Sequence, residues 1–252
     1  MLILSWNVNG LRSIHRKNAL ESLFRIKPDI LCLQETRIWG DRFLENQFRR
    51  AGYHAFFSHS SRKGYSGVAA YTRTLPTRVS HSLNSRRFDL DGRCVRLDFP
   101  SFTLLNVYMP HGRRNGSELP YKLRAYRALR ECLKDLSGSN VIIAGDFNIA
   151  HGEIDLARPR QNLENIMFTA DERRQLDALV SRGLRDSFRL LNEDAIAYTW
   201  WPYAYGARAR NLGWRIDYIF VSTKLIPHLT KSFVVHRSTG SDHCPVGVEF
   251  SF

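Results

Sequence analysis

Short apolar runs of strand length recur along this chain, and they constrain its fold more than any other feature. They predict strands over residues 2–6, 29–34, 67–71, 102–107, 141–144, 216–221 and 246–250. Apolar side chains at helical spacing predict helices over residues 17–27 and 121–136. A third helix is predicted to begin at Thr169, where Glu172 completes a capping box, and to close near Gly183. Because strands occur in both halves with helices between them, we expect two packed sheets with helices outside, in a single α/β domain over residues 1–252.

The charge of the chain narrows the class of partner. Lys plus Arg number 37 against 24 Asp plus Glu, a net charge of +13. This excess favours a polyanion, because neutralised phosphates release condensed counterions. The alternative is a basic protein with no nucleic-acid partner.

Two further features indicate where the protein works. No apolar run is long enough to span a membrane, and the first residues are typical of a strand rather than a signal peptide. No two of the four cysteines form a C-x-x-C pair, so we expect reduced, structural thiols rather than a zinc site or disulfide framework. These features predict a bacterial or archaeal cytosolic protein with no membrane partner.

Polar motifs stand where several apolar runs end. Glu35 directly follows one predicted strand, and Asn7 and Asn9 follow another. Together these residues present hard oxygen atoms of the kind that Mg²⁺ prefers. Asp146 and Asn148 fall on one face as the next run ends, so the acid can take a proton from water beside an amide that holds it. Taken singly, each motif also describes an ordinary turn.

Asp217 and His243 form the second candidate group. Asp217 is embedded in an apolar run, and a buried acid needs a partner. His243 stands shortly before the last predicted strand. An imidazole that donates one N–H to an acid presents its other nitrogen to a phosphate. We therefore predict an Asp217–His243 pair; because a lone histidine is more often a surface residue, the prediction rests on the whole set of motifs.

Taken in order, these motifs resemble the exonuclease III / apurinic–apyrimidinic (AP) endonuclease family, within the superfamily of DNase I-like nucleases and inositol phosphatases. The resemblance extends from Asn7 to His243 and includes four further blocks: Lys63-Gly64-Tyr65-Ser66-Gly67-Val68, Ala150-His151-Gly152-Glu153-Ile154-Asp155-Leu156, Tyr198-Thr199-Trp200-Trp201 and Asn211-Leu212-Gly213-Trp214-Arg215. It implies a four-layer α/β sandwich, in which two packed mixed sheets are flanked by helices and the site lies at one edge.

The resemblance also implies a role for each motif residue. Glu35 would bind Mg²⁺, with Mn²⁺ as a substitute, helped directly or through water by a set of possible further ligands: Asn7, Asn9 and Asp242. Asp146 would activate or position the attacking water, and Asn148 with Asn7 would orient water and phosphate. One metal ion and two metal ions both stay open.

The phosphate and the DNA would meet further residues of the same pattern. Tyr108 would hydrogen-bond the scissile phosphate, and His243, held by Asp217, would stabilise the developing charge. The implied DNA contacts are Arg37, a groove-entering loop at Gly64 and Tyr65, the site-lining Asn162 and Asn165, and an apolar pocket for a flipped abasic sugar formed by Trp200, Trp214 and Ile216.

Some positions depart from the family pattern. Asn9 stands where some members have Asp, which removes a carboxylate from the metal site. Trp200 stands where several members have Phe, and Ile166-Met167 where small residues are common, so entry to the pocket is expected to be narrower. His111 stands where Asn or Gln is frequent, which would add pH dependence.

The predicted function is a Mg²⁺-dependent DNA repair nuclease, monomeric and acting on damaged double-stranded DNA. It would cleave 5′ to an abasic site, clean blocked 3′ ends and carry 3′→5′ exonuclease activity. Three alternatives stay open: an enzyme that is mainly a 3′→5′ exonuclease or 3′-phosphatase, a small-molecule phosphatase of the same superfamily, and a basic DNA-binding protein without catalysis. Steep salt dependence would mark DNA binding.

Overall fold

The computed structural model describes the whole chain except residues 41–45, 47–50, 205 and 252. Its described strands form two six-stranded mixed sheets. The first sheet has the order β11-β12-β1-β2-β4-β3 and the second the order β5-β6-β7-β8-β10-β9. The strands of the first sheet are β1 (Leu2–Asn7), β2 (Ile30–Gln34), β3 (His54–Ser58), β4 (Val68–Thr72), β11 (Leu229–Val234) and β12 (Val246–Phe250). Those of the second are β5 (Arg78–Ser80), β6 (Cys94–Asp98), β7 (Thr103–Tyr108), β8 (Val141–Asp146), β9 (Leu184–Asp186) and β10 (Asp217–Ser222).

The helices connect these strands. The α-helices are α1 (Leu11–Arg16), α2 (Ala19–Arg25), α4 (Arg86–Leu90), α5 (Leu119–Lys134), α6 (Ala170–Val180) and α7 (Ser187–Leu191). Short 3₁₀ turns lie at η2 (Glu153–Asp155), η3 (Pro159–Gln161) and η4 (Thr223–His228). Every predicted strand and helix is confirmed, with ends that differ by a few residues. Helix α6 has the predicted capping box between Thr169 and Glu172.

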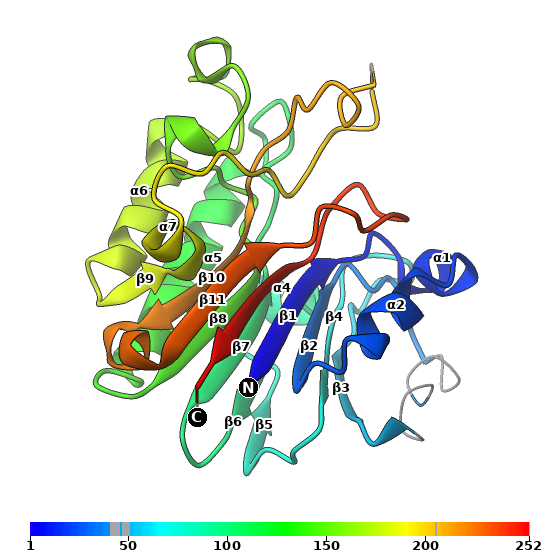
Figure 1. The fold of residues 1–252 in the computed structure, drawn as a ribbon. Helices are drawn as coiled ribbons and strands as arrows, with labels where there is room; N and C mark the ends of the chain where they lie inside the picture. Colours follow the sequence, from blue (N-terminus) through cyan, green and yellow to red (C-terminus); the bar gives the residue numbers. More distant parts are fainter. Residues whose placement is uncertain (41–45, 47–50, 205, 252) are drawn as a thin grey trace.

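The alternation of side chains along each strand creates four layers. Ile142 belongs to the core between the sheets, whereas its neighbour Ile143 packs under α5 and α6. Likewise Ile3 lies between the sheets and Leu4 lies under α1 and α2. Figure 1 shows α1 and α2 on one side of the two sheets and α5 and α6 on the other. The predicted four-layer α/β sandwich is therefore confirmed.

The strands that carry the polar motifs converge on one edge. β1 and β2 are parallel, as are β7 and β8, so the carboxyl ends of each pair lie together. β10 runs antiparallel to β8 and β12 antiparallel to β1, so both begin at that edge. Gly145 permits the close approach of β8 to β7, because a Cβ atom there would lie 1.9 Å from the Val107 carbonyl oxygen.

Two smaller predictions also have an outcome. The four cysteines are free thiols. Among the described helices, none combines the length and the apolar character needed to cross a bilayer.

Candidate active site

The side-chain amide of Asn7 hydrogen-bonds carboxylates from both sheets at the converging edge. Asn7 is the last residue of β1, and its Nδ2 donates to Glu35 Oε1 at 3.1 Å and to Asp146 Oδ2 at 2.9 Å. Glu35 follows β2 in the first sheet, and Asp146 ends β8 in the second. Asn7 Oδ1 accepts from the backbone N–H of Asn9 at 3.0 Å, which fixes the orientation of the amide. The site therefore exists only where the two sheets are docked.

Glu35 is held as a carboxylate. Tyr108, the last residue of β7, donates its hydroxyl to Glu35 Oε1 at 2.7 Å, and Arg37 forms an ion pair with Oε2. Burial would raise the pKa of Glu35, but Arg37, Tyr108 and Asn7 outweigh burial and lower that pKa. Glu35 has a backbone φ of 51°, in the left-handed region, so the turn after β2 is strained at the residue that carries the charge.

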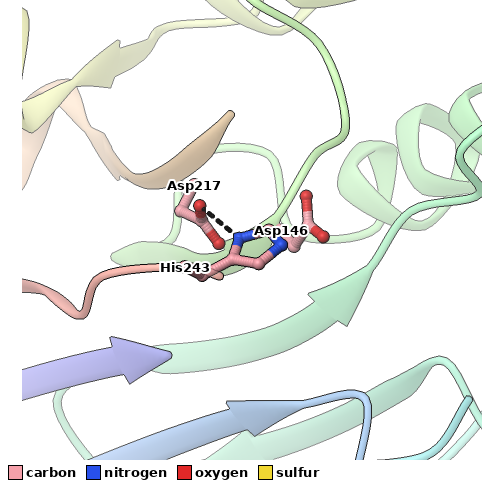
Figure 2. A group of neighbouring side chains, drawn as sticks. All are labelled: Asp146, Asp217 and His243. Atoms are coloured by element: carbon pink, nitrogen blue, oxygen red, sulfur yellow. Dashed lines mark hydrogen bonds and ion pairs between the residues drawn. The ribbon is translucent and has the colours of Figure 1, made fainter. Parts of the chain in front are cut away.

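His243 and Asp217 form a buried pair. His243 Nδ1 lies 2.9 Å from Asp217 Oδ2, and Figure 2 shows the imidazole ring between the carboxylates of Asp217 and Asp146. Trp6 Nε1 donates to the His243 backbone carbonyl at 3.1 Å and fixes the backbone. Burial alone would lower the pKa of His243, but the Asp217 charge outweighs it and raises that pKa to about 10. The ring is therefore an imidazolium whose Nε2 is available to a substrate.

Asp146 is poised to exchange a proton near neutral pH. Its Oδ1 accepts from the backbone N–H of Asn148 at 2.8 Å, and its Oδ2 accepts from Asn148 Nδ2 at 3.1 Å. Burial and the neighbouring Asp217 raise the pKa of Asp146 to about 7, against the opposing charge of His243. A carboxylate with a pKa close to the working pH is suited to general-base chemistry.

Asp242 directly precedes His243, and two side chains hold its carboxylate. Asn9 Nδ2 donates to Asp242 Oδ1 at 2.8 Å, and Trp200 Nε1 donates to Oδ2 at 3.0 Å. An aspartate in place of Asn9 would put two carboxylates at this distance and lose the bond. The amide therefore belongs to a neutral–anion pair, and Asn9 and Asp242 already satisfy each other.

An apolar group of side chains, here called the pocket cluster, lies beside the Asp217–His243 pair. It consists of Trp200, Trp214 and Ile216, the three predicted pocket residues, packed with Ile166, Met167, Phe168, Ala150, Leu156 and Leu119. Trp200 and Trp214 are half-buried and form a backbone bridge to each other, and the Trp200 ring lies 6.3 Å from the His243 ring. Met167 has a backbone φ of 79°, in the left-handed region that favours glycine.

The remaining predicted DNA contacts lie on the surface around the site. Gly64 is exposed and Tyr65 half-buried on the loop between β3 and β4. Asn165 is exposed and donates to Asn162 Oδ1 at 2.8 Å; within the described part of the chain, no hydrogen bond links these two asparagines to the carboxylates.

His111 does not titrate near neutral pH. Burial, helped by the charge of Lys122, lowers the pKa of His111 to about 4. The expectation that this residue adds pH dependence is therefore wrong for the neutral range, because the ring is already uncharged there.

Two groups of donors can take a divalent cation. Asp146, Asp217 and His243 each offer one ligand atom within 4.8 Å of the others. Asp217 Oδ1 is buried and has no hydrogen-bond partner among the described residues, which leaves a negative oxygen unsatisfied. Glu35 is the second place, a carboxylate with a lowered pKa that shares the Asn7 amide with Asp146. Oxygen-rich donors of this kind fit a hard divalent cation.

The predicted ligands differ in how well they fit that cation. Asn7 presents its NH₂ group rather than its oxygen to Glu35 and Asp146, an arrangement that suits an orienting residue better than a ligand. An imidazolium at His243 repels a cation, so Glu35 is the better anchor of the two groups.

Two buried residues that support the site, Lys122 and Thr199, were given no role by sequence reasoning. Lys122 Nζ donates to Asn148 O at 2.6 Å, to His111 O at 3.2 Å and to Glu172 Oε1 at 2.5 Å, so it ties two loops to helix α6. Thr199 Oγ1 accepts from the backbone N–H of Asp217 at 3.2 Å. The signal for Lys122 was available, because it lies four residues before Tyr126 on the apolar stripe of α5.

Comparisons with known proteins agree with this geometry. Residues 4–243 match the model of the Endonuclease/Exonuclease/phosphatase family. The chain is 38% identical over 249 residues to the Exodeoxyribonuclease of Bacillus subtilis (strain 168), covering 98% of each protein. It resembles the solved structure of an AP endonuclease from Archaeoglobus fulgidus with a TM-score of 0.92 and 31% identity, covering 100% of both chains. The same values hold for the 3′ phosphatase NExo (D146N) from Neisseria bound to product DNA hairpin.

Proposed function

Because this chain belongs to the endonuclease/exonuclease/phosphatase family and is a nuclease of the exonuclease III and AP endonuclease type, we propose that it incises damaged double-stranded DNA. The bond hydrolysed is the phosphodiester 5′ to an abasic site. The products are a 3′-hydroxyl and a 5′-deoxyribose phosphate. The same site would remove blocking groups from 3′ ends and shorten strands in the 3′→5′ direction.

One observation carries this proposal. Asn7 hydrogen-bonds both Glu35 and Asp146, and the His243 imidazolium lies beside Asp146. A candidate cation-binding carboxylate, a base of pKa about 7 and a positive donor thus lie together. These three components together are suited to hydrolysing a phosphodiester.

Each residue has a role in the proposed reaction. Asp146 accepts a proton from the attacking water, which Asn148 orients. The phosphorus–O3′ bond breaks as the water oxygen bonds to phosphorus, and the O3′ leaving group takes a proton from solvent. His243, kept positive by Asp217, donates to a phosphoryl oxygen. Tyr108 would turn its single hydroxyl hydrogen from Glu35 to another phosphoryl oxygen. Asn7 keeps the base and the metal ligand in register.

The metal-binding residues are proposed on the basis of donor chemistry. Glu35 would hold Mg²⁺, or Mn²⁺ in its place, with Asp242 and Asn9 acting through water. The bound ion offsets negative charge on the phosphoryl oxygens. Arg37 occupies the Glu35 carboxylate here and would turn to the DNA backbone when the ion binds.

The pocket cluster supports recognition of an abasic site. Trp200 and Trp214, packed with the buried Ile216, would form an apolar wall near His243 that favours a sugar without a base over an intact nucleotide. Gly64, Tyr65, Asn162 and Asn165 would contact the flanking backbone, with the +13 charge supplying general attraction to the duplex. We expect the protein to act as a monomer in the cytosol.

A second candidate function is a 3′→5′ exonuclease and 3′-phosphatase with little incision at abasic sites. The observation that favours it is the bulk of Trp200, Ile166 and Met167 in the pocket cluster. A small-molecule phosphatase is a poorer fit, because it needs neither the net positive charge nor the tryptophan wall.

The experiment that tests the proposal is cleavage of an end-labelled duplex that carries one abasic-site analogue, with Mg²⁺ and with EDTA, beside a matched intact duplex. Nicking at the abasic site alone, and only with Mg²⁺, supports the repair endonuclease. Stepwise shortening of both duplexes without nicking supports the second candidate. No cleavage of either duplex would contradict both.

A further inference from the structure

Arg93 is a buried arginine that none of the proposed roles uses. Its side chain is 4% exposed and lies just before β6, behind the edge that carries the site. Its Nε donates to Asp91 Oδ2 at 3.2 Å, its Nη1 to the Tyr108 carbonyl at 3.2 Å and its Nη2 to the Tyr65 hydroxyl at 2.8 Å. A guanidinium spreads its donors over three nitrogens in a rigid fork, so Arg93 fixes all three partners relative to one another.

Arg93 also contacts the rings of both tyrosines. Its guanidinium carbon lies 4.6 Å from the centre of the Tyr108 ring and 5.5 Å from the centre of the Tyr65 ring. Cation–π contact with a desolvated cation is strong enough to hold a ring in place. Tyr108 and Tyr65 come from different sheets, on β7 and on the loop before β4, and Arg93 is the group between them.

The hydroxyl of Tyr108 reaches the candidate site, whereas the hydroxyl of Tyr65 meets the buried Arg93. Tyr108 donates to Glu35 Oε1 at 2.7 Å. The Tyr65 hydroxyl accepts from Arg93, so its own hydrogen is left to point away from the arginine, and an O–H that accepts from a cation is a stronger donor. Arg62 stacks on the Tyr65 ring at 3.7 Å and closes the other face.

From this geometry, and resting on the proposed function, we propose that Arg93 is a positioning residue that makes Tyr65 and Tyr108 one rigid unit. Contact of the groove loop with DNA at Tyr65 then sets the hydroxyl of Tyr108 for the scissile phosphate. Binding and alignment are coupled through the guanidinium, with no contact between Arg93 and the substrate.

Asp91 completes the unit and explains why the charge is tolerated. Its Oδ2 accepts from Arg93 and from the Tyr121 hydroxyl at 3.0 Å. The buried cation is therefore paired, as a buried charge must be. Gly92, between the two residues, lies against the His59 backbone, where a Cβ atom would come within 2.4 Å, so this turn has little freedom to shift.

The test is a double-mutant cycle in single-turnover cleavage at saturating DNA, with affinity measured separately. Tyr65→Phe removes only the hydroxyl, and Arg93→Lys keeps the charge on a single nitrogen that cannot span three partners. Each should lower the cleavage rate about tenfold, the scale of one hydrogen bond. In a Tyr108→Phe background, each should have no further effect. Arg96→Lys, in β6 three residues after Arg93 and paired with Asp98, is the matched control and should leave the rate unchanged.

Losses that add fully to that of Tyr108→Phe, or a loss of DNA affinity alone, would overturn the proposal. If Arg93→Lys does not fold, Tyr65→Phe decides the outcome by itself. A second readout needs no substrate: the ¹³Cζ resonance of Tyr108, assigned by its absence in Tyr108→Phe, should move in Tyr65→Phe and stay in Arg96→Lys. If the wild-type protein cleaves no DNA, the proposed function fails, and this resonance still tests the coupling; a resonance that stays put in Tyr65→Phe contradicts it.

Discussion

Asp217 lies directly opposite Asp146 across the antiparallel pair of β10 and β8. Two buried carboxylates thus leave the sheet side by side, with one imidazole between them. Their mutual repulsion raises the pKa of Asp146, and their joint attraction raises that of His243. Asp217 therefore raises both pKa values, by repelling the Asp146 carboxylate and by attracting the His243 imidazolium.

We predict a bell-shaped pH profile from these shifts. Asp146 must be ionised to act as a base, so kcat/KM should rise with pH through about 7. His243 must keep its proton, so kcat/KM should fall above a pH of about 10. Asp217→Asn removes the negative neighbour and lowers both pKa values, so both limbs should move to lower pH. The test is the pH profile of kcat/KM between about pH 5.5 and 10.5. Limbs that do not move in Asp217→Asn would contradict the assignment of the base to Asp146 and of the positive donor to His243.

Substitutions can show whether Glu35 or the group of Asp146, Asp217 and His243 binds the metal ion. Glu35→Gln removes one charge and should raise the Mg²⁺ concentration for half-maximal rate at least tenfold, with a rate loss of about 100-fold or more. Asp217→Asn should lower the rate but leave the Mg²⁺ requirement near that of the wild type. If only Asp217→Asn shifts the requirement, the ion belongs with Asp146, Asp217 and His243. Metal titrations of the cleavage rate, with folding checked by circular dichroism, give the answer.

The tryptophan wall should affect selectivity more than chemistry. Trp214→Ala removes a face of the pocket cluster, so nicking at the abasic analogue should fall about tenfold. Shortening of the intact duplex should change less, because the carboxylates are untouched. An equal loss in both reactions would mean that Trp214 supports the site as a whole rather than reading the sugar.

A substitution at Met167 should increase abasic-site nicking, where Trp214→Ala decreases it. Its φ of 79° suits glycine, and its side chain fills part of the pocket cluster. Met167→Gly should relieve the backbone strain and open the pocket, raising the ratio of abasic nicking to exonuclease shortening by about tenfold. Both rates measured on the same duplexes test this. An unchanged ratio in a well-folded variant would show that entry to the pocket is not limiting.

Lys122 and Glu172 allow a test of stability. Both side chains are fully buried and bonded to each other. Lys122→Met leaves the Glu172 carboxylate without its charged partner, so the free energy of unfolding should fall by about 3–5 kcal/mol in urea titrations. Lys134→Met breaks the exposed pair with Glu131 and should leave that free energy near the wild-type value. Equal effects of the two changes would contradict the importance of burial.

The strands that could be predicted from the sequence are those of the sheet interiors. Strands β3, β5, β9 and β11 were missed, and they are the four edges of the two sheets; β6, beside an edge, was missed as well. An interior strand such as β2 is buried along its whole length and forms a continuous apolar run, whereas β11 exposes Thr230 and Lys231. Edge strands carry a weaker hydrophobic signal because water reaches them.

The site was predictable for a different reason. Carboxylates and amides at strand ends stand out against apolar runs, so Glu35, Asp146 and Asp217 could be named from their neighbours. Arg93 could not be named, because a basic residue in a basic chain gives no sign of burial. Lys122 gave one sign, its position on the apolar stripe of α5. Which residues touch depends on the order of the strands, and that order is set by contacts distant in sequence.

The amide of Asn7 makes catalysis conditional on the seam between the sheets. A slight parting of the two halves, by heat or by a cavity in the shared core, would separate Glu35 from Asp146 while every strand kept its own neighbours. The turnover rate therefore reports how closely the two sheets are packed. On warming, the turnover rate should fall before the circular dichroism signal does. Substitutions at the contact between the sheets should lower the rate even when they lie far from the carboxylates.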